Sequence, residues 1–280
     1  MKRALVMTHR LVEDTHGAFG PLLAAAQDAG FVLVLDPEET EKHGLTPREG
    51  FEVDASDLDA DIGIVLGGDG TILRALRHFA GTDVPVFAMN FGEVGFLATV
   101  EPDGMEESFR RAFAGEFEVL KLPAVMLSGV NGPKAAINDV SIHRKVGERV
   151  AQLAYAIEDA ELGSVRCDGL VIATPAGSTG YNLANAGPVM AWGVEGFAVS
   201  FIAPHSLTAR ALVVAPSDTL TVHNRGRDEV DVIVDGRPIG ELQPGEAVSA
   251  TFRHDVANLA QIRSSSFYRR LREKFGRLSS

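Results

Sequence analysis

A glycine-rich turn carrying one carboxylate is the segment whose residue types point most directly to chemistry. The turn follows an apolar run at 61–66 and precedes a segment whose apolar residues recur at helical spacing. It reads Gly67-Gly68-Asp69-Gly70-Thr71. Glycines let a backbone pass close to a bulky anion, and the start of a helix offers N–H groups with partial positive charge. The turn therefore predicts a phosphate-binding site.

Asp69 is the unusual member of this turn. A carboxylate beside bound phosphate repels it, so its presence favours a second task such as accepting a proton or binding a sugar hydroxyl. An ordinary Asp-Gly turn that caps a helix is the alternative, and the apolar strand with a doubled glycine before Asp69 favours the phosphate site. Neither a P-loop lysine after the glycines nor a G-x-G-x-x-G near Thr8 is present in the chain.

A second segment, 168–188, combines an apolar strand with a dense cluster of small and hydroxyl residues and a single aromatic ring, Tyr181. This composition suits a planar base that stacks on Tyr181 while hydroxyl and backbone groups bind the edge of the base. A long irregular turn in which Tyr181 fills a gap is an equally weighted alternative from these residues alone.

The predicted elements that position these residues differ between the first and the later part of the chain. Up to about residue 100, apolar runs at 4–8, 31–35, 61–66 and 84–89 alternate with helical patterns, which predicts an α/β domain with an open parallel-type sheet. After one more helix between Pro102 and Gly115, short alternating runs separated by turn residues predict an all-β, antiparallel, sandwich-like domain. These runs lie at 124–130, 140–143, 153–157, 170–174, 197–203, 219–222, 230–234 and 248–252.

The last residues return to a helical pattern, with Phe267, Leu271 and Phe275 at i, i+4 and i+8. We expect this helix to pack back on the α/β domain, in preference to a membrane, with the arginines at 269, 270 and 272 on a solvated face. The predicted domains are 1–100, joined by the helix 266–280, and a β-rich domain at 101–265.

Composition excludes several classes of protein. The 280 residues include 26 Lys and Arg against 38 Asp and Glu, and the resulting net charge of −12 argues against a nucleic-acid partner. The single cysteine, Cys167, forms no intramolecular disulfide, and the eight histidines lack the spacing of a metal site, so we expect no metal held by protein side chains. The apolar runs are too short for a signal peptide or a membrane span, which predicts a soluble cytoplasmic protein without a membrane partner.

Four motifs, taken in order, resemble the NAD kinases, which phosphorylate the adenosine 2′-hydroxyl of NAD to make NADP. They are the turn 67–71, the segment 90–97, the pair 138–139 and the segment 168–188. The resemblance covers nearly the whole chain. The Gly-Gly-Asp-Gly-Thr turn is shared with diacylglycerol-kinase-like and phosphofructokinase-like enzymes, whereas the segment 174–182 is much more specific.

The resemblance implies two domains that enclose the nucleotide, with the last helix packed on the first domain. It implies that Asp69 is the general base toward the 2′-hydroxyl of NAD and that ATP is the phosphoryl donor, with Mg²⁺ held mainly by the phosphates. The residues that would hold the ATP phosphates are Gly67, Gly68, Gly70 and Thr71.

The resemblance also assigns residues to the NAD site and indicates a homodimer or homotetramer. The residues that would line the site or surround the dinucleotide are Phe96, Asn138, Asp139, Asp168, Thr179, Gly180, Tyr181, Leu207 and Asp235, with Arg166 near phosphate. Two other functions stay open at this point. One is a lipid or sugar kinase that uses the same glycine turn, and the other is a non-catalytic module that senses NAD(H) or NADP(H).

Overall fold

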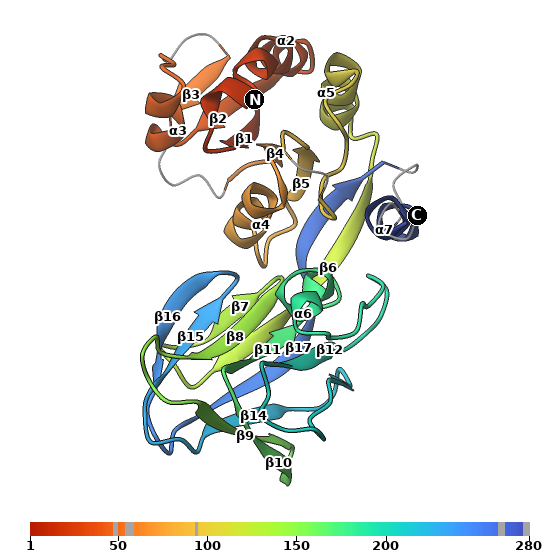
Figure 1. Cartoon of the computed structure of the whole chain (residues 1–280). Coiled ribbons are helices and arrows are strands. Elements are labelled where there is room, and N and C mark those ends of the chain that lie inside the picture. Colours follow the sequence, from red (N-terminus) through yellow and green to blue (C-terminus); the bar gives the residue numbers. More distant parts are fainter. Residues whose placement is uncertain (47–49, 54–58, 93–94, 263–266, 277–280) are drawn as a thin grey trace. The chain divides into compact units, whose positions relative to one another are not determined.

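The computed structural model describes residues 1–46, 50–53, 59–92, 95–262 and 267–276 (Figure 1). The chain divides into two compact units, Met1–Lys121 with Ala257–Ser280, and Leu122–Val256. The first unit thus extends past the predicted boundary at residue 100. The reason is helix α5 (Met105–Ala114), whose Phe113 ring lies 4.9 Å from that of Phe31 in the core of the first unit.

The first unit contains an open parallel sheet, as predicted. The strand order is β3-β2-β1-β4-β5, and the end of β17 pairs in parallel with β5. The bounds are β1 Lys2–Thr8, β2 Phe31–Leu35, β3 Phe51–Val53, β4 Ile62–Leu66, β5 Pro85–Met89 and β17 Ala247–Gln261. The chain therefore builds one side of the sheet from β1 outward and then returns to place β4 on the other side of β1.

Helices cover both faces of this sheet. Helix α2 (Phe19–Asp28) and α5 share one core cluster with the side chains of Ile62 and Ile64. Helix α4 (Asp69–His78) packs on the opposite face, where a Cβ added to Gly63 would stand 2.7 Å from the ring of Phe79. Because both faces are buried, the strands read as continuous apolar runs.

Three short helical segments were not predicted: α1 (Val12–Thr15), the 3₁₀ turn η1 (His16–Ala18) and α3 (Pro37–Lys42). Helix α3 begins shortly after the apolar run 31–35 that the sequence analysis assigned to a strand. The side chain of Asp36 accepts a hydrogen bond of 2.7 Å from the N–H of Glu39, and Pro37 occupies the first helical position. This is the ordinary chemistry of a helix N-terminus.

The second unit contains two antiparallel sheets around a shared core, which confirms the predicted sandwich-like class. One sheet has the order β13-β12-β11-β8-β15-β16, and the other contains β10-β9-β14 with the first part of β17, while β6 pairs with β17 and β7. The bounds are β6 Glu118–Ser128, β7 Lys134–Ala136, β8 Asp139–Arg144, β9 Ala151–Ile157, β10 Ala160–Cys167, β11 Gly169–Ala173, β12 Phe197–Ile202, β13 Leu212–Val214, β14 Leu220–Asn224, β15 Val230–Val234 and β16 Arg237–Leu242. The segment after β11 forms the 3₁₀ turn η2 (Gly177–Thr179) and the short helix α6 (Tyr181–Ala184).

The last helix, α7 (Phe267–Phe275), belongs to the first unit, as predicted. The rings of Phe267 and Phe275 lie 6.3 and 6.4 Å from that of Phe96. The predicted solvated arginine face is wrong for Arg270, which is only 8% exposed. Position 266 and positions 277–280 of the predicted helix lie outside the described residues. None of the helices in the described part of the chain is long and apolar enough to cross a membrane.

Candidate functional site

The glycine turn begins at the point where the strand order of the parallel sheet reverses. Strands β1 and β4 are neighbours in the sheet, with Thr8 paired to Leu66, although β2 and β3 separate them in sequence. The N–H of His9 donates a hydrogen bond of 2.7 Å to the carbonyl of Leu66, the residue directly before the turn. In open α/β sheets, ligands bind outside the carboxyl ends of the strands at such a switch point.

The turn itself is shaped by its glycines. A Cβ on Gly67 would stand 2.7 Å from the hydroxyl oxygen of Thr71, so the Thr71 side chain can fold over this position only because a glycine is there. A Cβ on Gly68 or Gly70 would meet no atom within 4 Å among the described residues. The backbone at these two positions is therefore open to a ligand at the first turn of α4, as a phosphate site requires.

The carboxylate of Asp69 is held by the loop that follows β5. Its Oδ2 accepts a hydrogen bond of 2.8 Å from the N–H of Phe96, and its Oδ1 accepts one of 3.1 Å from the N–H of Leu97. A Cβ on Gly95 would stand 1.9 Å from Oδ1, so only a glycine fits there. A carboxylate has about four acceptor sites, and these two bonds fix its orientation while leaving capacity for a ligand.

Helix α7 encloses Phe96. The Phe96 side chain is 4% exposed, its ring packs near Phe267 and Phe275, and the ammonium of Lys274 lies 4.8 Å from the ring centroid. The backbone of Phe96 therefore contacts Asp69 while its ring anchors α7. Residues Glu93 and Val94 of the same sequence motif lie outside the described residues.

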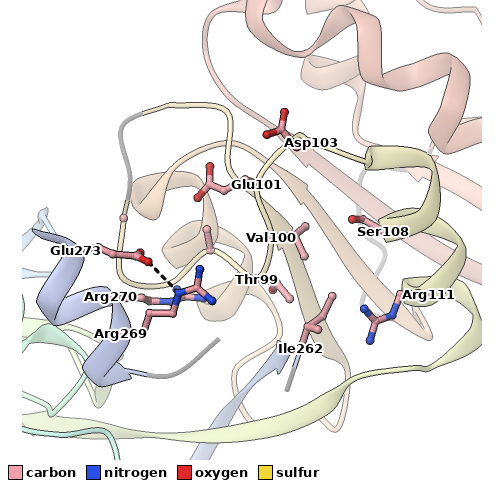
Figure 2. Close-up of a pocket in the computed structure, with 12 residues that line it drawn as sticks. Thr99, Val100, Glu101, Asp103, Ser108, Arg111, Ile262, Arg269, Arg270 and Glu273 are labelled. Carbon is pink, nitrogen blue, oxygen red and sulfur yellow. Dashed lines mark hydrogen bonds and ion pairs between the residues drawn. The ribbon is translucent and has the colours of Figure 1, made fainter. Parts of the chain in front are cut away.

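A cavity of about 320 Å³ lies beside this loop in the first unit. Figure 2 shows Arg269 and Glu273 of α7, joined by a hydrogen bond of 2.9 Å, at one side of the cavity and Arg111 of α5 at another. Glu101 and Arg270 also line it. The lining thus carries charges of both signs.

A buried ionic cluster, missed by the sequence analysis, ties α4 to the end of β1. Glu39 is 1% exposed, and its carboxylate accepts a hydrogen bond of 2.6 Å from the Thr8 hydroxyl and lies 2.6 Å from Lys42 Nζ. Arg74 of α4 also donates to it. Burial alone raises the pKa of Glu39, but hydrogen bonds from Lys42, Thr8 and Arg74 outweigh burial and lower it. The cluster fixes the direction of the helix that begins with Asp69.

In the second unit, Asp235 organises the pair Asn138 and Asp139. Its carboxylate accepts three backbone hydrogen bonds, of 3.0 Å from Ile137, 2.8 Å from Asn138 and 3.1 Å from Asp139. Asp235 is 8% exposed and sits at a φ of 46°, in the left-handed region that Asp tolerates better than most residues. This carboxylate is therefore a structural acceptor for the segment beside it.

The turn after β11 lies directly on this segment. The N–H of Thr174 donates a hydrogen bond of 2.9 Å to the carbonyl of Asn138, and the Thr174 hydroxyl donates one of 2.6 Å to that of Ile137. A Cβ on Gly177 would stand 2.1 Å from the Asn138 carbonyl oxygen. Among the described residues, the buried side-chain oxygen of Asn138 has no hydrogen-bond partner, so its acceptor capacity is unsatisfied.

Asp139 and Tyr181 make up the rest of this surface. Burial, reinforced by the charge of Asp235, raises the pKa of Asp139 to about 7. The Tyr181 side chain is 38% exposed, and its ring stacks on that of His143 at 5.6 Å with an interplanar angle of 12°. Burial and the charges of Asp139 and Asp168 raise the pKa of Tyr181, which places these carboxylates in its electrostatic range.

The remaining predicted residues of the second unit are more dispersed. Asp168 forms an ion pair of 2.6 Å with Nε of Arg144. Arg166 is exposed on β10, and Leu207 is 94% exposed. The Thr179 hydroxyl donates a hydrogen bond of 3.3 Å to the carbonyl of Ala176, and Gly180 is exposed at the start of α6. The predicted residues are thus divided between the two units. Asp69, the glycine turn and Phe96 belong to the first unit, and the other predicted residues belong to the second.

Comparison with protein families identifies both parts of the chain. The model described as the ATP-NAD kinase N-terminal domain matches residues 33–117, and that of the ATP-NAD kinase C-terminal domain matches residues 137–260. The chain is 34% identical over 242 residues to the NAD kinase of Lachnoclostridium phytofermentans, covering 81% of this chain and 85% of that protein. It is 30% identical over 283 residues to the NAD kinase of Gemmatimonas aurantiaca, covering 98% and 96%.

Two solved structures have the same fold. A yeast NADH kinase in complex with NADH matches with a TM-score of 0.88 and 22% identity, over 100% of this chain and 89% of that chain. An NAD kinase from Archaeoglobus fulgidus in complex with ATP matches with a TM-score of 0.74 and 24% identity, over 99% and 98%.

These two family models match the α/β unit with its glycine turn and the antiparallel β unit. Together they define a phosphoryl-transferring enzyme, a kinase. The chain belongs to the ATP-NAD kinase family, and the substrate that it phosphorylates is NAD.

Proposed function

We propose that this kinase transfers the γ-phosphoryl group of ATP to the adenosine 2′-hydroxyl of NAD, with Asp69 as the general base. The observation that carries the proposal is the position of Asp69. This residue begins α4 within the glycine turn, and its carboxylate is oriented by the N–H groups of Phe96 and Leu97. A carboxylate fixed beside a phosphate site is suited to receive a proton from an attacking hydroxyl.

In the proposed reaction, the 2′-oxygen of NAD forms the new bond to the γ-phosphorus of ATP, and the bond from that phosphorus to the bridging oxygen of ADP breaks. The hydroxyl proton moves to Asp69. Most of the rate acceleration comes from positioning and from neutralisation of charge by backbone N–H groups at the glycine turn. The open positions at Gly68 and Gly70 support this role, since a ligand can reach the backbone there.

Mg²⁺ belongs to the proposal as a cation bound mainly through the nucleotide phosphates. Among the described residues, no cluster of three or more His, Cys, Asp or Glu side chains is placed to hold a metal ion. Mg²⁺ commonly keeps waters and phosphate oxygens as ligands instead of a full set of protein side chains. When bound, the cation supplies charge neutralisation on the phosphates.

We further propose that NAD binds to the surface formed by Asn138, Asp139 and Tyr181. The exposed Tyr181 ring supports stacking with a planar base, and the unsatisfied oxygen of Asn138 supports a hydrogen bond from a ligand N–H or O–H once the side chain turns toward the ligand. Phe96, Asp168, Thr179, Gly180 and Leu207 stay predicted members of the NAD site, and Arg166 stays a predicted phosphate contact. The backbone contacts of Asp235 support a role in shaping this surface.

The test is to incubate the purified protein with ATP, Mg²⁺ and NAD and to measure NADP, with diacylglycerol and a sugar as competing acceptors in parallel reactions. We expect NADP to form from NAD. We expect no phosphorylated product when NAD is replaced by an analogue lacking the adenosine 2′-hydroxyl. Phosphorylation of the lipid or sugar in place of NAD would contradict the proposal. Tight binding of NAD without any product would identify a sensing module instead.

A homodimer or homotetramer and a cytoplasmic location stay predictions of the sequence. The exposed edge strands of the second unit, such as β13 with Val213 at 51% exposure, support self-association through strand edges. Analytical ultracentrifugation of the full chain measures the number of subunits, and a monomer at all concentrations would contradict the prediction.

A further inference from the structure

Arg270 places a guanidinium group in the interior of the first unit, against the loop that binds Asp69. The residue is 8% exposed, donates from Nη1 to the carbonyl of Phe96 and donates from Nη2 to Oε1 of Gln261 at 3.2 Å. Burial lowers the pKa of Arg270, while the charges of Asp69, Glu101 and Glu273 oppose that shift. A guanidinium is retained in such a place only when its donors are well paired.

The Phe96 carbonyl that Arg270 binds belongs to the same peptide group as the N–H of Leu97. That N–H donates to Oδ1 of Asp69 at 3.1 Å. Because a peptide group is planar and rigid, fixing its oxygen also fixes the direction of its N–H. A donor on the oxygen also polarises the peptide and strengthens the hydrogen bond that its N–H makes.

Three further contacts leave this loop little freedom. Gly95 packs against the Asp69 carboxylate without space for a Cβ, the neighbouring N–H of Phe96 binds Oδ2 at 2.8 Å, and the Phe96 ring is enclosed by α7. The loop is therefore clamped between Asp69 on one side and α7 on the other. Arg270 of α7 contacts the carbonyl oxygen of this peptide group.

We propose that Arg270 is a positioning residue for catalysis, acting on Asp69 through the peptide group between Phe96 and Leu97. The inference rests on the proposed role of Asp69 as general base. Helix α7 thereby contributes to the active site although Arg270 touches neither NAD nor ATP in the proposal. Arg270 also lines the cavity shown in Figure 2.

The first experiment compares Arg270→Met, Arg270→Lys and Arg272→Gln by steady-state NADP formation. Arg270→Met keeps an unbranched side chain of similar length but removes every donor. We expect kcat to fall by about tenfold to a hundredfold, since small misplacements of reacting groups have effects of this size, while KM for NAD and for ATP stays close to that of the parent. Arg272, exposed on the same helix, is the matched control and should leave kcat unchanged.

Arg270→Lys keeps the charge and one donor direction but lacks the planar fork. We expect it to fold with a thermal midpoint near that of the parent and to give a kcat between those of the parent and Arg270→Met. This variant keeps the inference testable if Arg270→Met does not fold. Parent-like kcat in folded Arg270→Met, or in Arg270→Lys where Arg270→Met does not fold, would overturn the inference.

The second experiment separates positioning of Asp69 from a general effect on the fold. We combine Arg270→Met with Asp69→Asn and measure single-turnover rates. If Arg270 acts through Asp69, its replacement causes little further loss once the base is gone. A full multiplicative loss in the double variant, or a rise in KM in place of the fall in kcat, would overturn the inference.

The Asp69 and Arg270 variants together distinguish failure of the proposed function from failure of the proposed role of Arg270. Near-parent turnover of Asp69→Asn alone removes Asp69 as the base, and the function proposed for it fails. Loss of turnover in Asp69→Asn with unchanged kcat in the Arg270 variants leaves that function standing and removes only the role of Arg270.

Discussion

A Cβ on Gly95 would stand 1.9 Å from Oδ1 and 2.4 Å from Cγ of Asp69, so the chain seats this carboxylate against a glycine. The two residues are separated by α4 and β5 in sequence and meet where the loop after β5 crosses the start of α4. A glycine is required at position 95 for lack of space and not for its backbone conformation, because Gly95 does not adopt a left-handed φ. This requirement links the geometry of the loop directly to the proposed base.

Gly95→Ala is therefore expected to displace the Asp69 carboxylate from its two N–H donors. We predict a fall in kcat of about tenfold to a hundredfold, the effect of misplacing a reacting group by an ångström or so. The measurement is steady-state NADP formation, with circular dichroism to verify folding. Gly20→Ala on α2, where an added Cβ meets no described atom within 4 Å, is the control and should keep parent kcat. Parent-like kcat in a folded Gly95→Ala would show that the close packing of Gly95 against the Asp69 carboxylate is not needed for catalysis.

Asp69→Asn tests the base itself. A general base contributes about 10²–10⁴-fold, so we predict that kcat falls at least about a hundredfold. The amide keeps the size of the side chain, so NAD should still bind, which isothermal titration calorimetry measures. Loss of NAD binding in parallel with kcat would assign Asp69 to substrate binding, and unchanged turnover would exclude it from the chemistry.

The α/β unit could be predicted from sequence because its strands are buried on both faces. The expected run 61–66 matches β4 within one residue, and 31–35 coincides with β2. The antiparallel unit was predicted less completely. Strands β10 and β16, where a register shift interrupts the pairing and few residues are buried, carry no clear apolar alternation and were missed.

The candidate site could be predicted only as far as local pattern reaches. The position of Asp69 follows from a strand, a glycine turn and a helix that are adjacent in sequence. The burial of Arg270 could not be predicted, because its acceptor at Phe96 is 174 residues away and helical arginines are usually solvated. The spacing of Phe267 and Arg270, at i and i+3 on one helix face, was the available signal.

Asp139 makes stability depend on pH. Its pKa is about 7 in the native state against an ordinary value of 3.8, because burial and then the charge of Asp235 disfavour the carboxylate. Between these values the native state retains a proton that the unfolded chain has released. The stability contributed by this group is therefore full below about pH 4 and is lost as pH rises through about 7.

The check is the difference in thermal midpoint between Asp139→Asn and the parent, measured from about pH 5 to about pH 8. Since asparagine does not titrate, we predict that the variant gains stability relative to the parent as pH rises across this range and that the gain levels off above about pH 7. A difference that does not change with pH would contradict the raised pKa. Asp168→Asn, at a carboxylate that is ion-paired with Arg144, is a useful comparison.

Tyr181 allows the proposed stacking to be separated from its hydroxyl. One face of the ring stacks on His143 at 5.6 Å, yet the side chain remains 38% exposed and able to receive a base. Stacking of a base on an aromatic ring contributes about 1–3 kcal/mol, so we predict that Tyr181→Ala raises KM for NAD by about tenfold to a hundredfold. Tyr181→Phe, which keeps the ring, should leave KM close to that of the parent. Steady-state kinetics at saturating ATP measure both, and equal KM values for the Ala and Phe variants would mean that the ring does not stack on the substrate.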